Sequence, residues 1–171
     1  IPDATGVTKQ DGDQKSRGIE LELMVRPRPD WHTFFSYALS DAELTRFTEF
    51  VAVPTATGVN FLFLDRSGNT PAFSPRHILN VWTAKGFRNG IELGVGGRYV
   101  SEQFIAEDNQ FQMDGVLTFD ASVSYTYKQW KFRMNAKNLT DRKYETRGFG
   151  ATSVIPAEPF GMYCAFELNL Q

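Results

Sequence analysis

The stretch WKFRMNAKNLTDRKYE, residues 130–145, decides the fold. In its first eight residues every second side chain is apolar, and the side chains between them are polar and include the cations of Lys131, Arg133 and Lys137. Successive side chains of a β-strand point to opposite faces, so this strand has one apolar face and one charged face. Unpaired charges are costly to bury in an ordinary core. The stretch therefore predicts a strand with an apolar side and a hydrated side.

The same period of two runs through almost the whole chain, and no stretch has the period of a helix. It predicts seven strands, at about 15–26, 31–40, 76–87, 91–102, 115–127, 130–137 and 159–170. Two prolines at 27 and 29 are expected to end the first strand, and residues 41–75 are expected to form a long irregular loop. We predict an all-β fold in which an antiparallel sheet runs up and down in chain order.

The connections alternate in length, which favours a membrane barrel. Short turns are expected at 27–30, 88–90 and 128–129, and medium or long loops between them. Outer-membrane barrels have short periplasmic turns, longer outer loops, an apolar lipid face, a polar lumen and aromatic girdles. Five aromatic residues fall beside the short turns and would form the periplasmic girdle: Trp31, Phe87, Tyr125, Tyr127 and Trp130. Alternation alone also fits a soluble β-sandwich binding module, so that alternative stays open.

Counting strands predicts that the chain, 1–171, is the C-terminal portion of a larger barrel domain. If the short turns are periplasmic, the last strand ends in the periplasm and residue 1 lies outside the cell. Complete bacterial barrels have an even number of strands, at least eight, and an open sheet edge is not tolerated in lipid. A small outer-membrane barrel, an adhesin or an enzyme of which one strand is missing here, is a second alternative.

Composition limits the other functions. A net charge of −2 gives no general attraction to nucleic acid. The single cysteine, Cys164, matches no disulfide or metal spacing, and His32 and His77 form no ligand pattern. Asp and Glu are scattered without a paired site. We expect no catalytic residues, no metal and no cofactor, so the protein is not expected to be an enzyme.

Five stretches together resemble the barrel of TonB-dependent outer-membrane receptors, and among them the ferric-siderophore group. They are SRGIELEL (16–23), TPAFSPRHILNVWTAKGF (70–87), GIELGVGGRYVSEQF (90–104), FDASVSYTYKQWKFRMNAKNLTDRKYE (119–145) and SVIPAEPFGMYCAFELNL (153–170). The resemblance covers nearly the whole chain from about Ser16. One departure is at the end, where the family usually finishes in an aromatic residue and this chain has Leu170 and Gln171.

The resemblance implies a barrel of about 22 strands filled by an N-terminal plug that this chain lacks. It implies binding of a ferric siderophore at the outer side, and uptake driven through the TonB–ExbB–ExbD complex. The barrel would sit in lipid of the bacterial outer membrane.

On this topology five groups of residues have expected roles. Five residues near the outer mouth are candidate ligand contacts: Arg98, Glu102, Asp114, Arg147 and Phe149. Arg and aromatic side chains suit ferric siderophores, which are often anionic or neutral and are rich in amide and aromatic groups. Asn138, Leu139, Asp141 and Tyr144 of NLTDRKY form a structural chain reversal. Lys131, Arg133 and Lys137 form a lumenal basic row, paired with acidic groups such as Asp120 or seating the plug.

The other two groups have alternative roles. Phe61, Phe63 and Phe73 would bind ligand or pack their loop. Gly94, Gly96 and Gly97 would permit curvature of the sheet or close approach of the plug.

Overall fold

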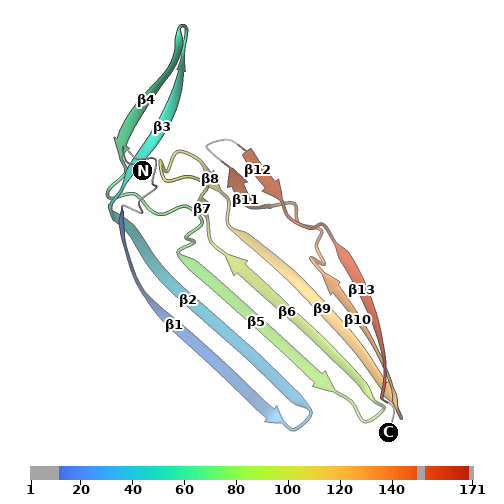
Figure 1. Ribbon diagram of the computed structural model, residues 1–171. Coiled ribbons are helices and arrows are strands. Elements are labelled where there is room, and N and C mark those ends of the chain that lie inside the picture. Colours follow the sequence, from blue (N-terminus) through green and yellow to red (C-terminus); the bar gives the residue numbers. More distant parts are fainter. Residues whose placement is uncertain (1–11, 150–152, 170–171) are drawn as a thin grey trace.

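One antiparallel sheet of seven strands dominates the computed structural model, which describes residues 12–149 and 153–169 (Figure 1). Each strand pairs with the next one in the sheet. The strands are β1 (Asp13–Arg28), β2 (Trp31–Arg46), β5 (His77–Gly86), β6 (Ile91–Val100), β9 (Val116–Tyr127), β10 (Trp130–Lys137) and β13 (Gly161–Leu168). The predicted all-β, antiparallel, up-and-down order is confirmed. The predicted position of residue 1 and the end of the last strand at Leu170 lie outside the described residues.

The first strand does not end before its prolines, as the sequence had suggested. β1 continues through Pro27, with a register shift between Val25 and Arg28. β1 is at the edge of the described sheet. A proline has no backbone N–H to donate, and an edge strand tolerates this because one of its sides pairs with no other strand. The turn is therefore only two residues long, Pro29 and Asp30.

All three short turns lie at one end of the sheet, and the longer connections lie at the other (Figure 1). The backbone N–H of Gly86 donates to the oxygen of Asp30, which joins the first two turns. The N–H of Asn169 donates to the oxygen of Gln129, so the end of β13 lies against the third turn. The sheet thus has a turn end and a loop end.

The expectation of an irregular loop over 41–75 is wrong. β2 continues to Arg46, and β3 (Thr48–Thr55) and β4 (Gly58–Asp65) form a hairpin that projects beyond the sheet (Figure 1). Two shorter pairs occupy the other connections: β7 (Gln103–Phe104) with β8 (Gln112–Met113), and β11 (Glu145–Phe149) with β12 (Ser153–Pro156). The sequence did not predict the β3–β4 hairpin, because its two strands are short and have apolar residues on both faces, which leaves no period of two.

One face of the seven-stranded sheet is apolar from edge to edge. Its outward side chains are large and exposed: Leu21 is 54% exposed and Phe132 43%. Others on this face include Ile19, Leu23, Val81, Leu93, Val95, Leu117, Phe119, Met162, Phe166 and Leu168. No second sheet covers this face among the described residues. A soluble β-sandwich needs such a sheet, and the described residues do not supply one.

Among the described residues, no helix is long and apolar enough to cross a membrane.

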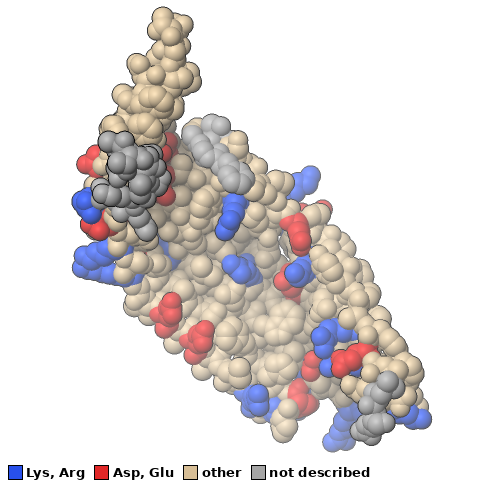
Figure 2. Space-filling view, viewed as in Figure 1, with Lys and Arg blue, Asp and Glu red and all other residues tan. Residues whose placement is uncertain are grey.

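The opposite, polar face carries charged and amide side chains in the middle of the strands. One row crosses five strands through Glu22, Ser36, Asn80, Arg98 and Thr118, which are cross-strand partners in turn. Figure 2 shows acidic and basic side chains within the face turned to the viewer as well as at its rim. One apolar and one polar face are what a wall between lipid and a hydrated lumen requires.

Aromatic side chains gather at the turn end. Tyr125 and Tyr127 stack at 6.5 Å between ring centroids, and Trp130 stacks on Phe166 at 5.1 Å. The ammonium group of Lys85 lies 5.7 Å from the ring centroid of Trp31. Aromatic rings with nearby cations suit the boundary between lipid and water.

Lys85 also lies over Phe87, at 5.5 Å from its ring centroid. All five aromatics that the sequence placed beside the short turns therefore lie at this end, and Phe166 joins them from β13.

Two glycines of β6 make room for a tryptophan. A Cβ on Gly94 would lie 2.6 Å from Cζ2 of Trp82, and a Cβ on Gly96 would collide with Cε3 of the same ring. The indole therefore lies across β6 on the polar face. Gly97 faces the other way, against Phe119. The glycines accommodate a side chain of the neighbouring strand β5, whereas the sequence had suggested the plug or curvature.

Candidate functional site

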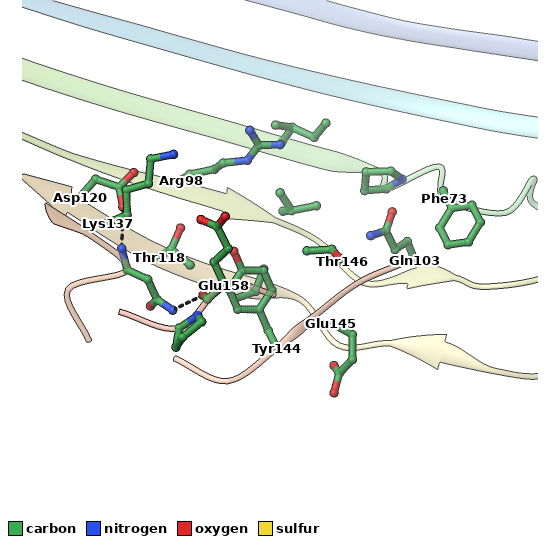
Figure 3. A pocket seen from close by; sticks show the side chains of 16 residues that line it. Phe73, Arg98, Gln103, Thr118, Asp120, Lys137, Tyr144, Glu145, Thr146 and Glu158 are labelled. Carbon is green, nitrogen blue, oxygen red and sulfur yellow. Dashed lines mark hydrogen bonds between the residues drawn. The ribbon is translucent and has the colours of Figure 1, made fainter. Parts of the chain in front are cut away.

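A cavity of about 610 Å³ lies on the polar face near the loop end of the sheet (Figure 3). Its wall combines strand residues with residues of the connections. The lining residues are Phe73, Pro75, Ile78, Arg98, Val100, Gln103, Val116, Thr118, Asp120, Lys137, Asn138, Tyr144, Glu145, Thr146, Glu158 and Pro159. A pocket of this size, with mixed aromatic, apolar and charged groups, is typical of a small-molecule site.

Arg98 is the predicted ligand residue that the structure places in this cavity. The polar face of β6 presents it, directly across from Asn80 on one side and Thr118 on the other. Asn80 donates its amide to the hydroxyl of Ser36 at 3.1 Å, so it is already engaged. Arg98 makes no ion pair or hydrogen bond with any residue in the described part of the chain.

Two carboxylates of the cavity each accept one hydrogen bond within the described structure. Oδ1 of Asp120 accepts a hydrogen bond of 2.8 Å from the backbone N–H of Asn138. Oε2 of Glu158 accepts one of 3.3 Å from the hydroxyl of Tyr163. Lys137 comes from the end of β10, and its ammonium lies 5.6 Å from the ring centroid of Tyr163. Asp120 and Lys137 thus both enter the cavity wall, but they do not form an ion pair in the described structure.

The NLTDRKY stretch contributes Asn138 and Tyr144 to the cavity wall and fixes the chain where it leaves β10. Asn138 is 5% exposed and has a positive φ of 50°. Its side-chain amide donates to the backbone oxygens of Arg142 at 3.0 Å and Glu158 at 3.2 Å, and its Oδ1 accepts from the N–H of Arg142 at 2.9 Å. Asparagine tolerates the left-handed conformation and bonds nearby backbone, which suits it to this position.

The rest of the motif fixes the two ends of the connection. The N–H of Leu139 donates to the oxygen of Phe119 at 2.7 Å. Oδ1 of Asp141 accepts from the N–H of Phe160 at 2.8 Å, just before β13 begins. The backbone oxygen of Tyr144 accepts from Ala157 at 2.8 Å, and the Tyr144 ring lines the cavity. These bonds tie the exit of β10 to the entry of β13.

Three other predicted ligand residues do not line the cavity. Glu102 and Asp114 are exposed near the β7–β8 hairpin, and Arg147 is exposed on β11. Phe149 belongs to β11, but its side chain lies outside the described residues. The predicted cluster around the mouth is thus divided between the cavity and the outer hairpins.

The predicted basic row is divided in the same way. Lys131 faces Glu167 of β13 across the pair, and Arg133 faces Ser124 of β9, with no acid directly opposite. Only Lys137 reaches the cavity. The pairing of this row with Asp120 is therefore not seen in the described structure, because Asp120 bonds to the backbone of Asn138.

The predicted phenylalanine cluster is also divided. Phe61 and Phe63 both pack on Phe50, each at 5.0 Å between centroids, within the β3–β4 hairpin. Phe73 lies elsewhere: it lines the cavity, and its N–H donates to the oxygen of Phe104. Its φ of 56° places it in the left-handed region.

An ion pair secures the base of the hairpin. Arg66 Nε donates to Oε2 of Glu49 at 2.8 Å, and both side chains are partly buried. Next to it, the hydroxyl of Ser67 and then its N–H donate to Asp65, and these bonds hold the pKa of Asp65 below its usual value.

Sequence reasoning missed three polar residues of the cavity wall, Gln103, Thr118 and Glu158. Thr118 had a signal, because it alternates onto the same face as Asp120. Gln103 and Glu158 belong to connections, whose path no periodicity predicts. No group of three or more His, Cys, Asp or Glu side chains in the described part of the chain could hold a metal ion.

An open sheet with one lipid-facing side, an aromatic girdle beside short turns and a cavity on its hydrated side defines a class: the wall of a membrane-spanning β-barrel. Comparison with known proteins gives the family. Residues 2–139 match the family model described as TonB dependent receptor-like, beta-barrel. The chain belongs to this family and forms part of an outer-membrane barrel, as its motifs had indicated.

Relatives of known description agree with this assignment. The chain is 26% identical over 152 residues to the ferrichrome outer membrane transporter/phage receptor of Escherichia coli K12, covering 84% of this chain and 18% of that protein. It is 25% identical over 171 residues to the metal-pseudopaline receptor CntO of Pseudomonas aeruginosa, covering 98% of this chain and 22% of that protein. The chain therefore spans about a fifth of the length of the curated relatives it matches.

Solved structures show the same fold. The siderophore receptor PiuA from Acinetobacter baumannii superposes with a TM-score of 0.77 at 22% identity, over 92% of this chain and 22% of that one. The ferric yersiniabactin uptake receptor FyuA from Yersinia pestis gives 0.75 at 19% identity, over 94% of this chain and 24% of that one.

Proposed function

We propose that this chain is the C-terminal portion of the barrel of an outer-membrane active transport receptor. The receptor binds a ferric siderophore at the extracellular side and admits it to the periplasm with energy transmitted by TonB and the ExbB–ExbD complex. The single observation that carries the proposal is the polar cavity at the loop end, on the hydrated face of a barrel wall whose other face is apolar. Family membership supports the TonB-dependent mechanism.

The strand pairing supports a larger closed barrel. In the described sheet, β1 pairs only with β2, and β13 only with β10. Free N–H and C=O groups along these edges would be costly in lipid. Further strands of the same barrel are the natural partners for both edges, which makes a small eight-stranded barrel the weaker alternative.

The mechanism proposed here involves binding and conformational change without covalent chemistry. Arg98 would contact the ligand in the cavity, and Glu102, Asp114, Arg147 and Phe149 would meet it higher in the mouth. Lys131, Arg133 and Lys137 would seat the plug that fills the barrel, since lumenal cations need acidic partners. The Asn138 motif would keep the cavity wall in place.

Deletion of the complete gene tests this function. Growth on iron-limited medium and uptake of radioactive iron are compared between the wild type, the deletion strain and the strain that regains the intact gene. A panel of ferric siderophores, with hydroxamate, catecholate and carboxylate members, identifies the substrate. Loss of uptake for at least one member, and the same loss without TonB, is expected. Unchanged uptake of every member would refute the iron assignment.

A further inference from the structure

Two connections at the loop end of the sheet are bonded to each other through side chains. The 69–73 segment belongs to the β2–β5 connection, and its partners belong to the β6–β9 connection. The N–H of Thr70 donates to Oδ1 of Asn109 at 2.8 Å, and the Asn109 amide donates back to the oxygen of Thr70 at 2.7 Å. The N–H of Ala72 donates to Oε2 of Glu107 at 2.7 Å. Two side chains of one connection thus hold three backbone groups of the other.

Backbone groups and a small apolar core support the same contact. The N–H of Phe73 donates to the oxygen of Phe104 at 2.9 Å, and the Asn69 amide donates to the backbone oxygen of Glu107 at 2.7 Å. Beside them, Ile105 is buried, with an exposed fraction of 5%. Both partners belong to the described part of the chain, so the contact does not depend on further strands of the barrel.

The contact holds a strained residue in the cavity wall. Phe73 has a φ of 56°, in the left-handed region that a bulky side chain rarely adopts. Such a conformation persists only where the surrounding structure imposes it, and residues of this kind are concentrated at ligand-binding sites. Figure 3 shows the Phe73 ring at the end of the cavity where Gln103 also lies. The bonded connections therefore fix the position of an aromatic ring that lines the cavity.

We propose that Glu107 and Asn109 are positioning residues for ligand binding. They hold the 69–73 segment before the ligand arrives, so that the Phe73 ring is already presented to the cavity in the unliganded receptor. A wall that is ordered in advance loses less conformational freedom when the ligand binds. A released wall would reduce the apparent affinity by the fraction of time that it spends in the competent conformation. The inference rests on the proposed function and adds to it the residues that preform this side of the site.

The test uses the complete receptor, with variants that remove or restore single bonds. Glu107→Ala removes the acceptor for the Ala72 N–H, whereas Glu107→Gln keeps an oxygen that can accept in its place. The double variant Glu107→Ala/Asn109→Ala removes both side-chain acceptors. Asp108→Ala is the matched control, because the Asp108 carboxylate accepts from the N–H of Gln110, within its own turn.

The first measurement is hydrogen exchange of the unliganded receptor in detergent. Glu107→Ala should speed exchange at the Ala72 amide about ten- to a hundredfold, because a hydrogen bond to a charged group is lost. Glu107→Gln should restore much of the protection, and Asp108→Ala should exchange as the wild type. Equal exchange at Ala72 in Glu107→Ala and the wild type would overturn this inference and leave the transport function intact.

The second measurement is uptake of radioactive iron by cells, with ferrichrome, ferric enterobactin and ferric citrate as probes. Rates are normalised to the amount of folded receptor in the outer membrane. For each probe whose uptake depends on the gene, the double variant should raise the apparent KM about tenfold at an unchanged maximal rate, since a wall formed a tenth of the time binds tenfold more weakly. Glu107→Gln and Asp108→Ala should keep the wild-type KM.

The KM separates positioning from a general loss of stability. A variant that only destabilised the barrel would lower the amount of folded receptor and keep the wild-type KM. An unchanged KM in the double variant, together with faster exchange at Ala72, would therefore overturn the inference. Uptake of all three probes that does not depend on the gene would instead refute the proposed function itself.

Discussion

Replacing Asn138 should loosen the connection between β10 and β13 far more than its size suggests. Its side chain makes three hydrogen bonds to backbone groups of Arg142 and Glu158, and it is 5% exposed. Each such bond contributes about 1 kcal/mol net, so Asn138→Gly should cost about 3 kcal/mol. Alanine adds about 1 kcal/mol because the backbone is left-handed, with φ at 50°.

Hydrogen exchange of the complete receptor in detergent measures this loss of local stability at the backbone amides of the β10–β13 connection. A loss of about 3 kcal/mol should speed local exchange at the Arg142 amide about 150-fold in Asn138→Gly, and the loss in Asn138→Ala should speed it about 1000-fold. Asn135→Ala is the matched control: the same residue type on β10, without a side-chain hydrogen bond in the described structure. Unchanged protection in Asn138→Ala, or equal loss in Asn135→Ala, would refute the fastening role.

Three further predictions follow from particular contacts. Gly94→Ala should cost about 1–3 kcal/mol of barrel stability, because its Cβ would lie 2.6 Å from Cζ2 of Trp82. In a double-mutant cycle, Gly94→Ala should cost much less in a Trp82→Leu background. An equal cost in both backgrounds would contradict a clash with Trp82. Val95 lies on the apolar face and is 49% exposed, so Val95→Arg should cost about 2–4 kcal/mol of barrel stability and reduce the amount of folded receptor in the outer membrane. A normal amount of folded receptor would indicate that this face does not contact lipid. Ser67→Ala should raise the pKa of Asp65 towards 3.8. Since that pKa is lowered in the folded hairpin, the stabilisation is present above the unfolded value and is lost as pH falls through the folded one; NMR titration of Asp65 checks it, and an unchanged pKa would contradict the Ser67 bonds.

The strands could be predicted because their signal is local. Alternation of WKFRMNAK and six similar stretches follows directly from the opposite directions of successive side chains, and the apolar and polar faces follow with it. Short turns at 88–90 and 128–129 fixed which strand ends meet. The girdle followed as well, since its aromatics lie within a few residues of these turns.

The connections were less readable. The uncharged segment 50–64 has apolar residues on both faces of a hairpin, so it shows no strand period, and it was predicted as irregular loop. Phe73 was grouped with Phe61 and Phe63 because they are near in sequence. The chain path separates them, and Phe73 reaches the cavity beside residues from β6 and β10.

The sequence by itself determined the sheet, its two faces, the order of its strands and the family, because each depends on residue type at regular spacing. Only the tertiary structure decided which charged groups contact one another. The sequence had paired the basic row, which includes Lys137, with acidic groups such as Asp120. In the described structure the carboxylate of Asp120 instead accepts from the backbone of Asn138, and the ammonium of Lys137 lies over the Tyr163 ring. Backbone N–H groups and cationic side chains compete for the same carboxylate over a few ångströms. Which of them bonds to Asp120 depends on the path of the β10–β13 connection, which the local sequence pattern does not contain.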